Sequence, residues 1–262
     1  MPNLYESLIE RVFFENWKKG ASVVEFERKE IERAAKRLEI DLPKNIGDAI
    51  YSFRYRRQLP LSILNTAPKG VHWIIEGAGR SKYRFKLVRE SRIVPRTDLL
   101  SIKVPDATPE IIAKYALSDE QALLAKVRYN RLVDIFLSLT AYSLQNHLRT
   151  TVKNLGQIEI DEMYVGINRS GTHFIIPIQA KGGKDQLSFV QASQDIACCT
   201  EKFPDLVCRS VSAQFMDDEV IAMFEIVLAG DSLKIADERH FQLVPADDIT
   251  AKELAAYRRQ SK

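Results

Sequence analysis

The sequence predicts an α/β protein with a mixed β-sheet flanked by helices, preceded by a small α+β domain. Three observations predict it. Amphipathic segments of helical length fill much of the first sixty residues, near-continuous apolar strands occupy residues 156–181, and basic residues concentrate in residues 54–96. Strands of that apolar character are typical of a sheet covered on both faces. The 262 residues fit two domains of about 150 residues or fewer.

Composition restricts the class of protein. A hydrophobic content of 45% and a charged content of 28% are typical of an ordinary soluble globular chain. No apolar run approaches the ~20 residues that span a bilayer, so we expect no membrane partner. Cys198, Cys199 and Cys208 are odd in number and lack Cys-x-x-Cys spacing. This pattern favours a reducing, cytoplasmic location and small buried thiols over a zinc site.

The first domain is expected over residues 1–95. Apolar periodicity predicts helices at residues 4–18, 24–38 and 45–57, and β-rich runs predict strands at 71–75 and 82–88. Three helices followed by a hairpin resemble the layout of a winged helix. Such a domain would present its hairpin as a wing.

The positive charge of the chain is concentrated in this domain. Residues 54–96 hold eleven basic residues and two acids, a net +9, which leaves −6 for the rest of a chain whose total is +3. This asymmetry predicts a polyanion partner, and double-stranded DNA is the expected one. An alternative for the second strand is a basic edge that resists aggregation. The candidate DNA-binding residues are Arg54, Arg56, Arg57, Arg80, Lys82, Arg84 and Lys86.

A connector is expected at residues 96–117, and a second domain at 118–262. Ser118-Asp119-Glu120-Gln121 has the form of a capping box that opens a helix to about residue 137. Glu120 can serve the helix dipole there or add a carboxylate to a nearby site. Residues 140–151 predict a strand. Further along, we expect a helix at 186–202, strands at 206–215 and 234–244, and a short tail at 252–262.

A hairpin at residues 156–181 carries the most informative polar residues. Asn168-Arg169-Ser170-Gly171 is turn chemistry between two β-rich arms. If residues 169–171 form a three-residue loop with a left-handed glycine, paired positions sum to 340. Asp161 then faces Gln179, Glu159 faces Lys181, and all four side chains share one face.

Pro177 is the residue that could shift this register. It lies inside the second arm and lacks a ladder donor, so a bulge or a sheet edge is expected near it. A bulge would shift the pairing by one residue and bring Glu162 to the site in place of Asp161.

The polar residues of the hairpin suit metal-assisted chemistry. Carboxylate and amide oxygens hold hard divalent cations, and a lysine beside them places a positive charge near an attacking water. The alternative is a solvated polar face. Apolar neighbours on both arms argue for burial, and burying acids and a lysine is costly unless they are paired or bound to metal.

The arrangement Asp161…Gln179-Ala180-Lys181 resembles the PD-(D/E)XK nuclease superfamily, in its branch with Gln-x-Lys, whose best-known members are Mrr-type restriction nucleases. The resemblance covers residues 118–245 and implies a restriction-endonuclease-like fold. It implies Mg²⁺, with Mn²⁺ as a substitute, held by Asp161, Gln179 and the Ala180 carbonyl. Lys181 would activate water or stabilise the reacting phosphate.

This chain departs from the commoner motif at two places. Gln179 is neutral, and Ile160 stands where a proline usually precedes the acid. Glu159 or Glu162 could offset the missing charge. In the family a glutamine on the helix that follows can contact the phosphate. Here the candidates are Gln191 and Gln194, which are three residues apart and share a helix face.

The resemblance therefore predicts a magnesium-dependent DNA endonuclease that restricts foreign DNA. One site cuts one strand, so double-strand cleavage requires a homodimer or successive nicking. Two alternatives stay open: a DNA-binding regulator in which Gln179 marks a degenerate nuclease fold, and a structure-specific junction nuclease.

Overall fold

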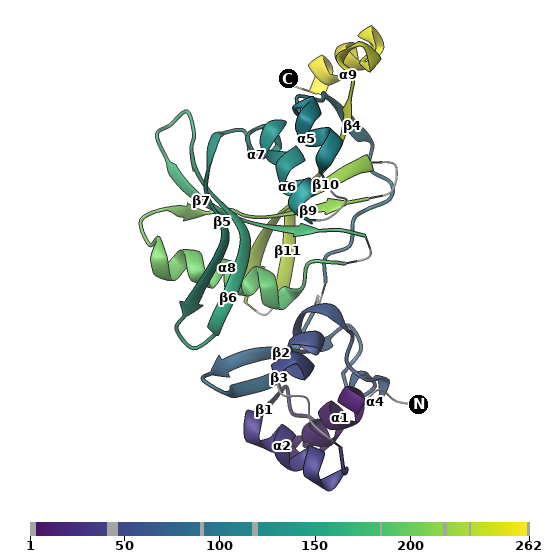
Figure 1. Ribbon diagram of the computed structural model, residues 1–262, viewed down its shortest axis with the longest axis vertical. Helices are drawn as coiled ribbons and strands as arrows, with labels where there is room; N and C mark the ends of the chain where they lie inside the picture. Colours follow the sequence, from purple (N-terminus) through teal and green to yellow (C-terminus); the bar gives the residue numbers. More distant parts are fainter. Residues whose placement is uncertain are drawn as a thin grey trace.

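The computed structural model describes residues 4–40, 47–89, 92–116, 120–183, 185–216, 219–230 and 232–260. It contains a three-stranded and an eight-stranded β-sheet, each with its own helices (Figure 1). The larger sheet is mixed and flanked by helices, so the predicted α/β class is confirmed. We call the part around the small sheet the N-terminal module and the part around the large sheet the C-terminal module.

The N-terminal module alternates helices and strands. Its elements are α1 (Leu4–Asn16), β1 (Val23–Glu27), α2 (Arg28–Arg37), α3 (Gly47–Tyr51), a π-helical segment (Ser52–Arg56), α4 (Leu61–Leu64), β2 (His72–Gly79) and β3 (Lys82–Val88). The helix expected at residues 24–38 begins late, because Val24 and Phe26 alternate with exposed neighbours and form β1. Glu27 then caps α2 through a reciprocal capping box with Glu30.

Strand β3 lies in the middle of the small sheet, in the order β1-β3-β2, and is antiparallel to both neighbours. The alternative of a basic edge strand is therefore wrong. The alternation predicted for β3 is confirmed: Phe85 is fully buried, and Tyr83 and Leu87 pack against the same core. The basic residues between them occupy the other face.

The large sheet runs in the order β4-β11-β10-β9-β7-β6-β5, with β8 pairing to β7 beside β9. The β4–β11 and β7–β9 pairs are parallel and the other pairs on this path are antiparallel. The strands are β4 (Ser101–Pro105), β5 (Thr140–Val152), β6 (Gly156–Ile167), β7 (His173–Lys181), β8 (Val207–Cys208), β9 (Ser210–Phe215), β10 (Val220–Ala229) and β11 (Ser232–Val244).

The helices of the C-terminal module are α5 (Glu110–Tyr115), α6 (Glu120–Tyr129), α7 (Leu132–Leu137), α8 (Phe189–Lys202) and α9 (Ala251–Gln260), with a 3-10 turn at Ala246–Asp248. The expected connector at 96–117 supplies edge strand β4 and α5, and the expected tail forms α9. Strand β10 was not predicted. The single helix expected to residue 137 is interrupted by Arg131, whose backbone is left-handed. The capping box predicted at Ser118 lies outside the described residues.

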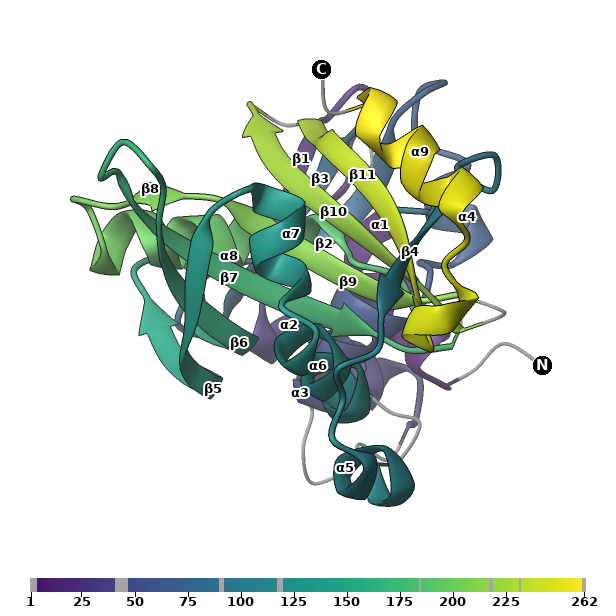
Figure 2. The same ribbon diagram turned by 90° about the horizontal axis from the view of Figure 1, so that it is seen from above.

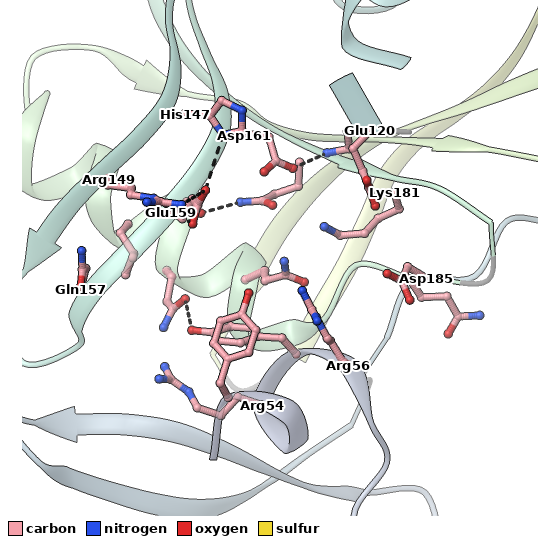
Figure 3. Close-up of a pocket in the computed structure, with 18 of the residues that line it drawn as sticks. Arg54, Arg56, Glu120, His147, Arg149, Gln157, Glu159, Asp161, Lys181 and Asp185 are labelled. Carbon is pink, nitrogen blue, oxygen red and sulfur yellow. Dashed lines mark hydrogen bonds and ion pairs between the residues drawn. The ribbon is translucent and has the colours of Figure 1, made fainter. Parts of the chain in front are cut away.

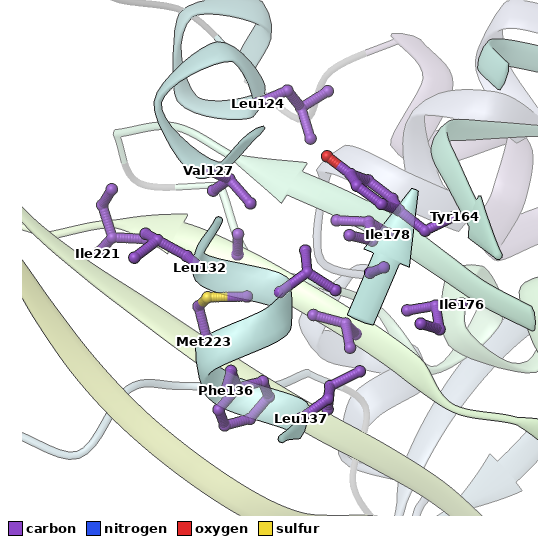
Figure 4. Close-up of a cluster of buried hydrophobic side chains, with 14 of the residues drawn as sticks. Leu124, Val127, Leu132, Phe136, Leu137, Tyr164, Ile176, Ile178, Ile221 and Met223 are labelled. Carbon is purple, nitrogen blue, oxygen red and sulfur yellow. The ribbon is translucent and has the colours of Figure 1, made fainter. Parts of the chain in front are cut away.

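Both faces of the large sheet are covered, as its apolar strands predict. Helices α6 and α7 pack on one face, where Leu124, Val127 and Phe136 belong to the same buried cluster as Ile176 and Ile178 (Figures 2 and 4). Helix α8 packs on the other face. None of the helices within the described ranges is long and apolar enough to cross a membrane.

The two modules share part of their hydrophobic core. Ile74 of β2 and Val88 of β3 belong to one buried cluster with Phe189 of α8 and Phe224 of β10. The backbones also approach closely at Gly77, where an added Cβ would lie 2.6 Å from the carbonyl oxygen of Leu155. These contacts place the N-terminal module against α8, β10 and the β5–β6 turn.

Candidate active site

The β6–β7 hairpin has the register expected from its turn. Cα partners run from Ile167↔His173 to Glu162↔Ile178, and every pair sums to 340. The Asn168 N–H donates to the Thr172 carbonyl, and Gly171 has a φ of 76°. The turn is therefore the three-residue loop with a left-handed glycine on which the prediction depended.

Pro177 does not introduce a bulge between β6 and β7, so that expectation is wrong. Hydrogen-bonded pairs alternate along an antiparallel ladder, and counting from the hydrogen bond between Asn168 and Thr172 places Met163↔Pro177 among the pairs without hydrogen bonds. The nitrogen of Pro177 faces the other neighbour. There the pairing of β7 passes from β8, at Ile175, to β9, at Ile178, so no ladder donor is required of Pro177.

Beyond Glu162↔Ile178 the two strands separate, and side chains bridge the opening. Asp161 Oδ2 accepts a 2.9 Å hydrogen bond from the Ala180 N–H. Gln179 Nε2 donates to the Glu159 carbonyl at 3.0 Å. The residues predicted to face each other, Asp161 and Gln179, thus lie beyond the last paired residues, and the side chain of each bonds a backbone atom of the opposite strand. We call this region, where side-chain hydrogen bonds join the strands beyond the end of the ladder, the polar end of the hairpin.

A buried aspartate on α8 lies beneath this bridge. Asp195 is 1% exposed, and its Oδ1 accepts a 3.2 Å hydrogen bond from Gln179 Nε2. Both hydrogens of that amide nitrogen are therefore engaged in the interior. The carbonyl oxygen, Oε1, is the end of the Gln179 amide left for a ligand. Asp195 is thus a positioning residue for Gln179.

The polar end opens into a cleft of about 720 Å³ (Figure 3). Its hairpin wall carries Glu159, Asp161, Gln179, Ala180 and Lys181. Its opposite wall comes from the N-terminal module, and Figure 3 shows Arg56 of the π-helical segment reaching toward Lys181. A lysine beside carboxylates, opposite an arginine, suits a ligand that carries negative charge and binds a cation.

The carboxylates of the cleft differ in environment. Burial is the main cause that raises the pKa of Asp161 above its ordinary value, and the negative charges of Glu159 and Glu120 raise it further. The positive charge of Lys181 and the hydrogen bond from the Ala180 N–H lower it. Glu159 is more exposed and pairs with Arg149 at 3.3 Å and with His147 at 3.5 Å. A cation in the cleft would favour the ionised form of Asp161.

Glu162 lies on the opposite side of the sheet. It is fully buried, its Oε1 accepts from Arg128 Nε at 2.9 Å and from Ser143 Oγ at 2.5 Å, and it is absent from the cleft lining. Glu162 is therefore directed away from the cleft, and Asp161 is the one of the two acids that lines it with Gln179 and Lys181. Glu162 cannot offset the neutral Gln179 from that position.

Two further predicted accessory residues lie at the cleft in different roles. Glu120, at the start of α6, lines it, and its carboxylate lies 3.8 Å from where a Cβ of Gly182 would be. Gln191 also lines it, but its side chain accepts from the Ser188 N–H and so completes the capping box of α8. Capping accounts for Gln191 without a ligand.

The predicted DNA-binding arginines of the π-helical segment point in different directions. Arg56 is exposed in the cleft. Arg54 also lines it, but its Nε and Nη2 atoms are buried without a hydrogen-bond partner among the described residues. Arg57 is exposed and lines a separate cavity of about 330 Å³ with Trp73 and Arg92.

The basic face of β3 is partly neutralised by acids. Arg84 Nε lies 2.5 Å from Oε1 of the buried Glu76, and Lys86 Nζ lies 3.9 Å from the same atom. Glu25 and Glu27 of β1 pair across from Arg84 and Lys82. Arg80 and Lys82 are the exposed cations of this row, so they are the better candidates for phosphate contacts.

The cysteines have the environments that the sequence predicted. Cys198 and Cys199 are buried on α8, Cys208 is partly buried, and all three are free. Burial raises the pKa of the Cys198 thiol to about 11. They are packing residues of the cluster between α8 and the hairpin.

The oxygen donors at the cleft fit a magnesium ion that is held by few protein ligands. In the described part of the chain, no group of three or more His, Cys, Asp or Glu residues could hold a metal by itself. Mg²⁺, however, usually keeps several waters and takes one or two carboxylates together with substrate phosphates. Asp161, the Gln179 amide oxygen and the Ala180 carbonyl match that pattern in type and number. No protein-family model, curated protein or solved structure matches this chain.

Sequence reasoning missed Asp195. The signal that could have found it is an acid on the apolar face of an amphipathic helix, between Ala192 and Cys198, both buried. Unpaired burial of a carboxylate is costly, so a buried acid implies a polar partner. The identity of that partner, Gln179, follows only from how α8 packs on β7.

We predict that Asp195→Asn stabilises the protein at alkaline pH. Burial raises the pKa of Asp195 well above its ordinary value of about 3.9. The native state therefore holds a proton that the unfolded chain releases, and the free energy of unfolding falls as pH rises above that ordinary value. Asparagine keeps an acceptor for Gln179 and removes the charge.

The measurement is thermal unfolding of parent and variant in EDTA from pH 4 to pH 8. The Tm of the variant should exceed that of the parent at pH 8, by about 2–4 °C for each kcal/mol gained, and the difference should shrink toward about pH 4. Asp185→Asn, an exposed acid of the same cleft, is the matched control and should show no such trend. A parent more stable than the variant at pH 8 would mean that Asp195 is favourably ionised.

Proposed function

We propose that the protein is a magnesium-dependent DNA endonuclease that hydrolyses phosphodiester bonds in the cleft. The observation that carries the proposal is the convergence of Asp161, Gln179 and Lys181 in one cleft at the end of the hairpin, opposite an arginine-bearing wall. A carboxylate, a neutral oxygen donor and an ammonium group in one small volume suit attack of water on a phosphodiester.

Each residue has a role that its position supports. Three oxygen atoms would hold Mg²⁺, with Mn²⁺ as a substitute. They are the Asp161 oxygen that does not accept the Ala180 hydrogen bond, the Gln179 amide oxygen and the Ala180 carbonyl oxygen. The bound metal would supply Lewis-acid polarisation of the phosphate. Lys181 would neutralise charge that develops on the phosphate or orient the attacking water, and Asp195 keeps the Gln179 amide in its orientation.

The arrangement around the site supports the resemblance to restriction endonucleases. The hairpin lies within a mixed sheet covered by helices and is followed by α8, which flanks the site. The three-stranded sheet and helices of the N-terminal module are consistent with a winged helix that binds double-stranded DNA. Restriction of foreign DNA is the proposed biological role, with a homodimer or successive nicking for double-strand cleavage.

A DNA-binding regulator with a degenerate nuclease site is the second candidate. Two observations favour it: Gln179 carries no charge, and one oxygen of Asp161 is already engaged by the Ala180 N–H. A chain of this kind would bind DNA without cutting it. Incubation with supercoiled plasmid and Mg²⁺ separates the two candidates, because only the nuclease produces nicked or linear products.

We predict that Lys181→Ala reduces plasmid cleavage by at least about 100-fold while leaving DNA binding nearly intact. A positive charge that faces the developing phosphate charge acts mainly in the transition state, and loss of one such group costs about that much. Cleavage rates and gel-shift affinities are measured on the same preparations. Lys234→Ala, at an exposed position of β11, is the control. A Lys181 variant that cuts within a few-fold of the parent places the chemistry elsewhere.

We predict that Asp161→Asn abolishes both cleavage and Mn²⁺ binding, whereas Glu162→Gln leaves Mn²⁺ affinity close to that of the parent. Asp161 supplies the only carboxylate of the proposed ligand set, while Glu162 binds Arg128 on the far side of the sheet. Glu162→Gln should instead lower the Tm, because it weakens a buried ion pair. Titration with Mn²⁺ monitored by electron paramagnetic resonance gives the affinities. Loss of Mn²⁺ binding in the Glu162 variant alone would reverse the assignment.

We predict that charge reversal at Arg80 and Lys82 weakens DNA binding across unrelated sequences and flattens its salt dependence. Each lost phosphate contact should reduce the slope of log K against log salt by about 0.9. Arg84 is left intact, because a glutamate there would face the buried Glu76. Charge reversal at the exposed Lys252 of α9, which lies at the end of the C-terminal module far from β3 (Figure 1), is the control. A slope equal to the parent's would show that this face makes no phosphate contacts.

A further inference from the structure

A tyrosine on the N-terminal wall of the cleft is exposed in a way that packing does not explain. Tyr51, the last residue of α3, is 48% exposed and lines the cleft. Phe53, two residues later, is 4% exposed and belongs to the core of the N-terminal module. The segment therefore directs one aromatic ring into its core and leaves another facing the cleft.

The exposed ring is backed by a second ring and a guanidinium. The Tyr51 and Tyr55 centroids lie 4.8 Å apart at an interplanar angle of 58°, and the Arg56 guanidinium lies 5.4 Å from the Tyr51 centroid. Aromatic rings combined with arginine form the surface on which proteins stack unpaired bases. We call Tyr51 and Arg56 the stacking platform.

Tyr55, the ring that packs against the platform, is held in place relative to the hairpin. The Tyr55 hydroxyl donates to Gln194 Oε1 at 3.1 Å, and Arg92 Nη1 donates to the Tyr55 carbonyl at 2.9 Å. Gln194 precedes Asp195, which holds Gln179. One helix, α8, therefore positions both walls of the cleft. Preorganised walls lose little entropy when a ligand binds between them.

We propose that the stacking platform binds an unpaired nucleobase next to the bond that is cut, so that the substrate is single-stranded or locally unpaired nucleic acid. In a duplex, neighbouring base pairs cover both faces of each base, and a tyrosine ring cannot stack on it. An unpaired base can lie on Tyr51, its phosphate beside Arg56, with Lys181 on the opposite wall. This inference rests on the proposed function and narrows its substrate.

The test measures binding without cleavage. Oligonucleotides that carry 2-aminopurine, as a single strand or within a full duplex, are titrated in EDTA with the parent, Tyr51→Ala and Tyr51→Phe. Tyr51→Ala should weaken single-strand binding about tenfold, the loss expected for one base–aromatic stack, and leave duplex binding unchanged. Tyr51→Phe keeps the ring and should bind as the parent does. Tyr142→Ala, at an exposed tyrosine of β5 that does not line the cleft, is the matched control.

Several results would overturn the inference: no single-strand binding by the parent, equal loss in the Ala and Phe variants, or equal loss on duplex and single strand. Thermal unfolding of each variant confirms that the fold is retained.

In Mg²⁺, the parent should cut gapped or branched DNA faster than intact duplex, and Tyr51→Ala should lose that preference. Tyr51-dependent binding without any cleavage would refute the hydrolytic function alone. Lys181-dependent cleavage with no effect of Tyr51→Ala would refute the platform alone.

Discussion

The unbroken register of the β6–β7 hairpin is the constraint on which the site depends. Because side chains alternate between the faces of a sheet, a slip of one residue would exchange Asp161 for Glu162 at the cleft. The loop that ends in the left-handed Gly171 sets the register, and the change of partner from β8 to β9 lets Pro177 lie in β7 without disturbing it. A local turn and a long-range pairing therefore determine together which carboxylate faces the cleft.

Where the ladder ends, the hairpin exchanges backbone hydrogen bonds for side-chain hydrogen bonds. Asp161 takes the Ala180 N–H, and the Gln179 amide joins the Glu159 carbonyl to the buried Asp195. A charged residue in place of Gln179 would lie against Asp195, and two buried carboxylates in contact repel each other. The neutral amide is thus the partner that the aspartate of α8 requires, which gives a structural reason for an uncharged residue at position 179.

The N-terminal module is a wall of the same cleft and not an appendage. It shares a hydrophobic cluster with α8 and β10, approaches the β5–β6 turn at Gly77, and carries Tyr51 and Arg56 to face Lys181. Arg80, in the β2–β3 turn, and Lys82, on β3, are exposed cations, whereas Arg84 forms an ion pair with Glu76. Some of the positive charges of this module are therefore neutralised by ion pairs within the protein, and others are exposed to solvent.

The sequence by itself determined the hairpin and its register from Ile167↔His173 to Glu162↔Ile178, because a short loop and a period of two are local properties. The meeting of Asp161, Gln179 and Lys181 at one cleft lies beyond the last paired residues and depended on the tertiary structure. The sequence also determined the alternation of β3 and most helices. It did not determine that residues 101–105 pair with β11, that β10 lies between β9 and β11, or that Asp195 lies beneath Gln179. Those features depend on contacts between residues far apart in the chain, where several packings satisfy the same apolar pattern, and only the assembled tertiary structure selects among them.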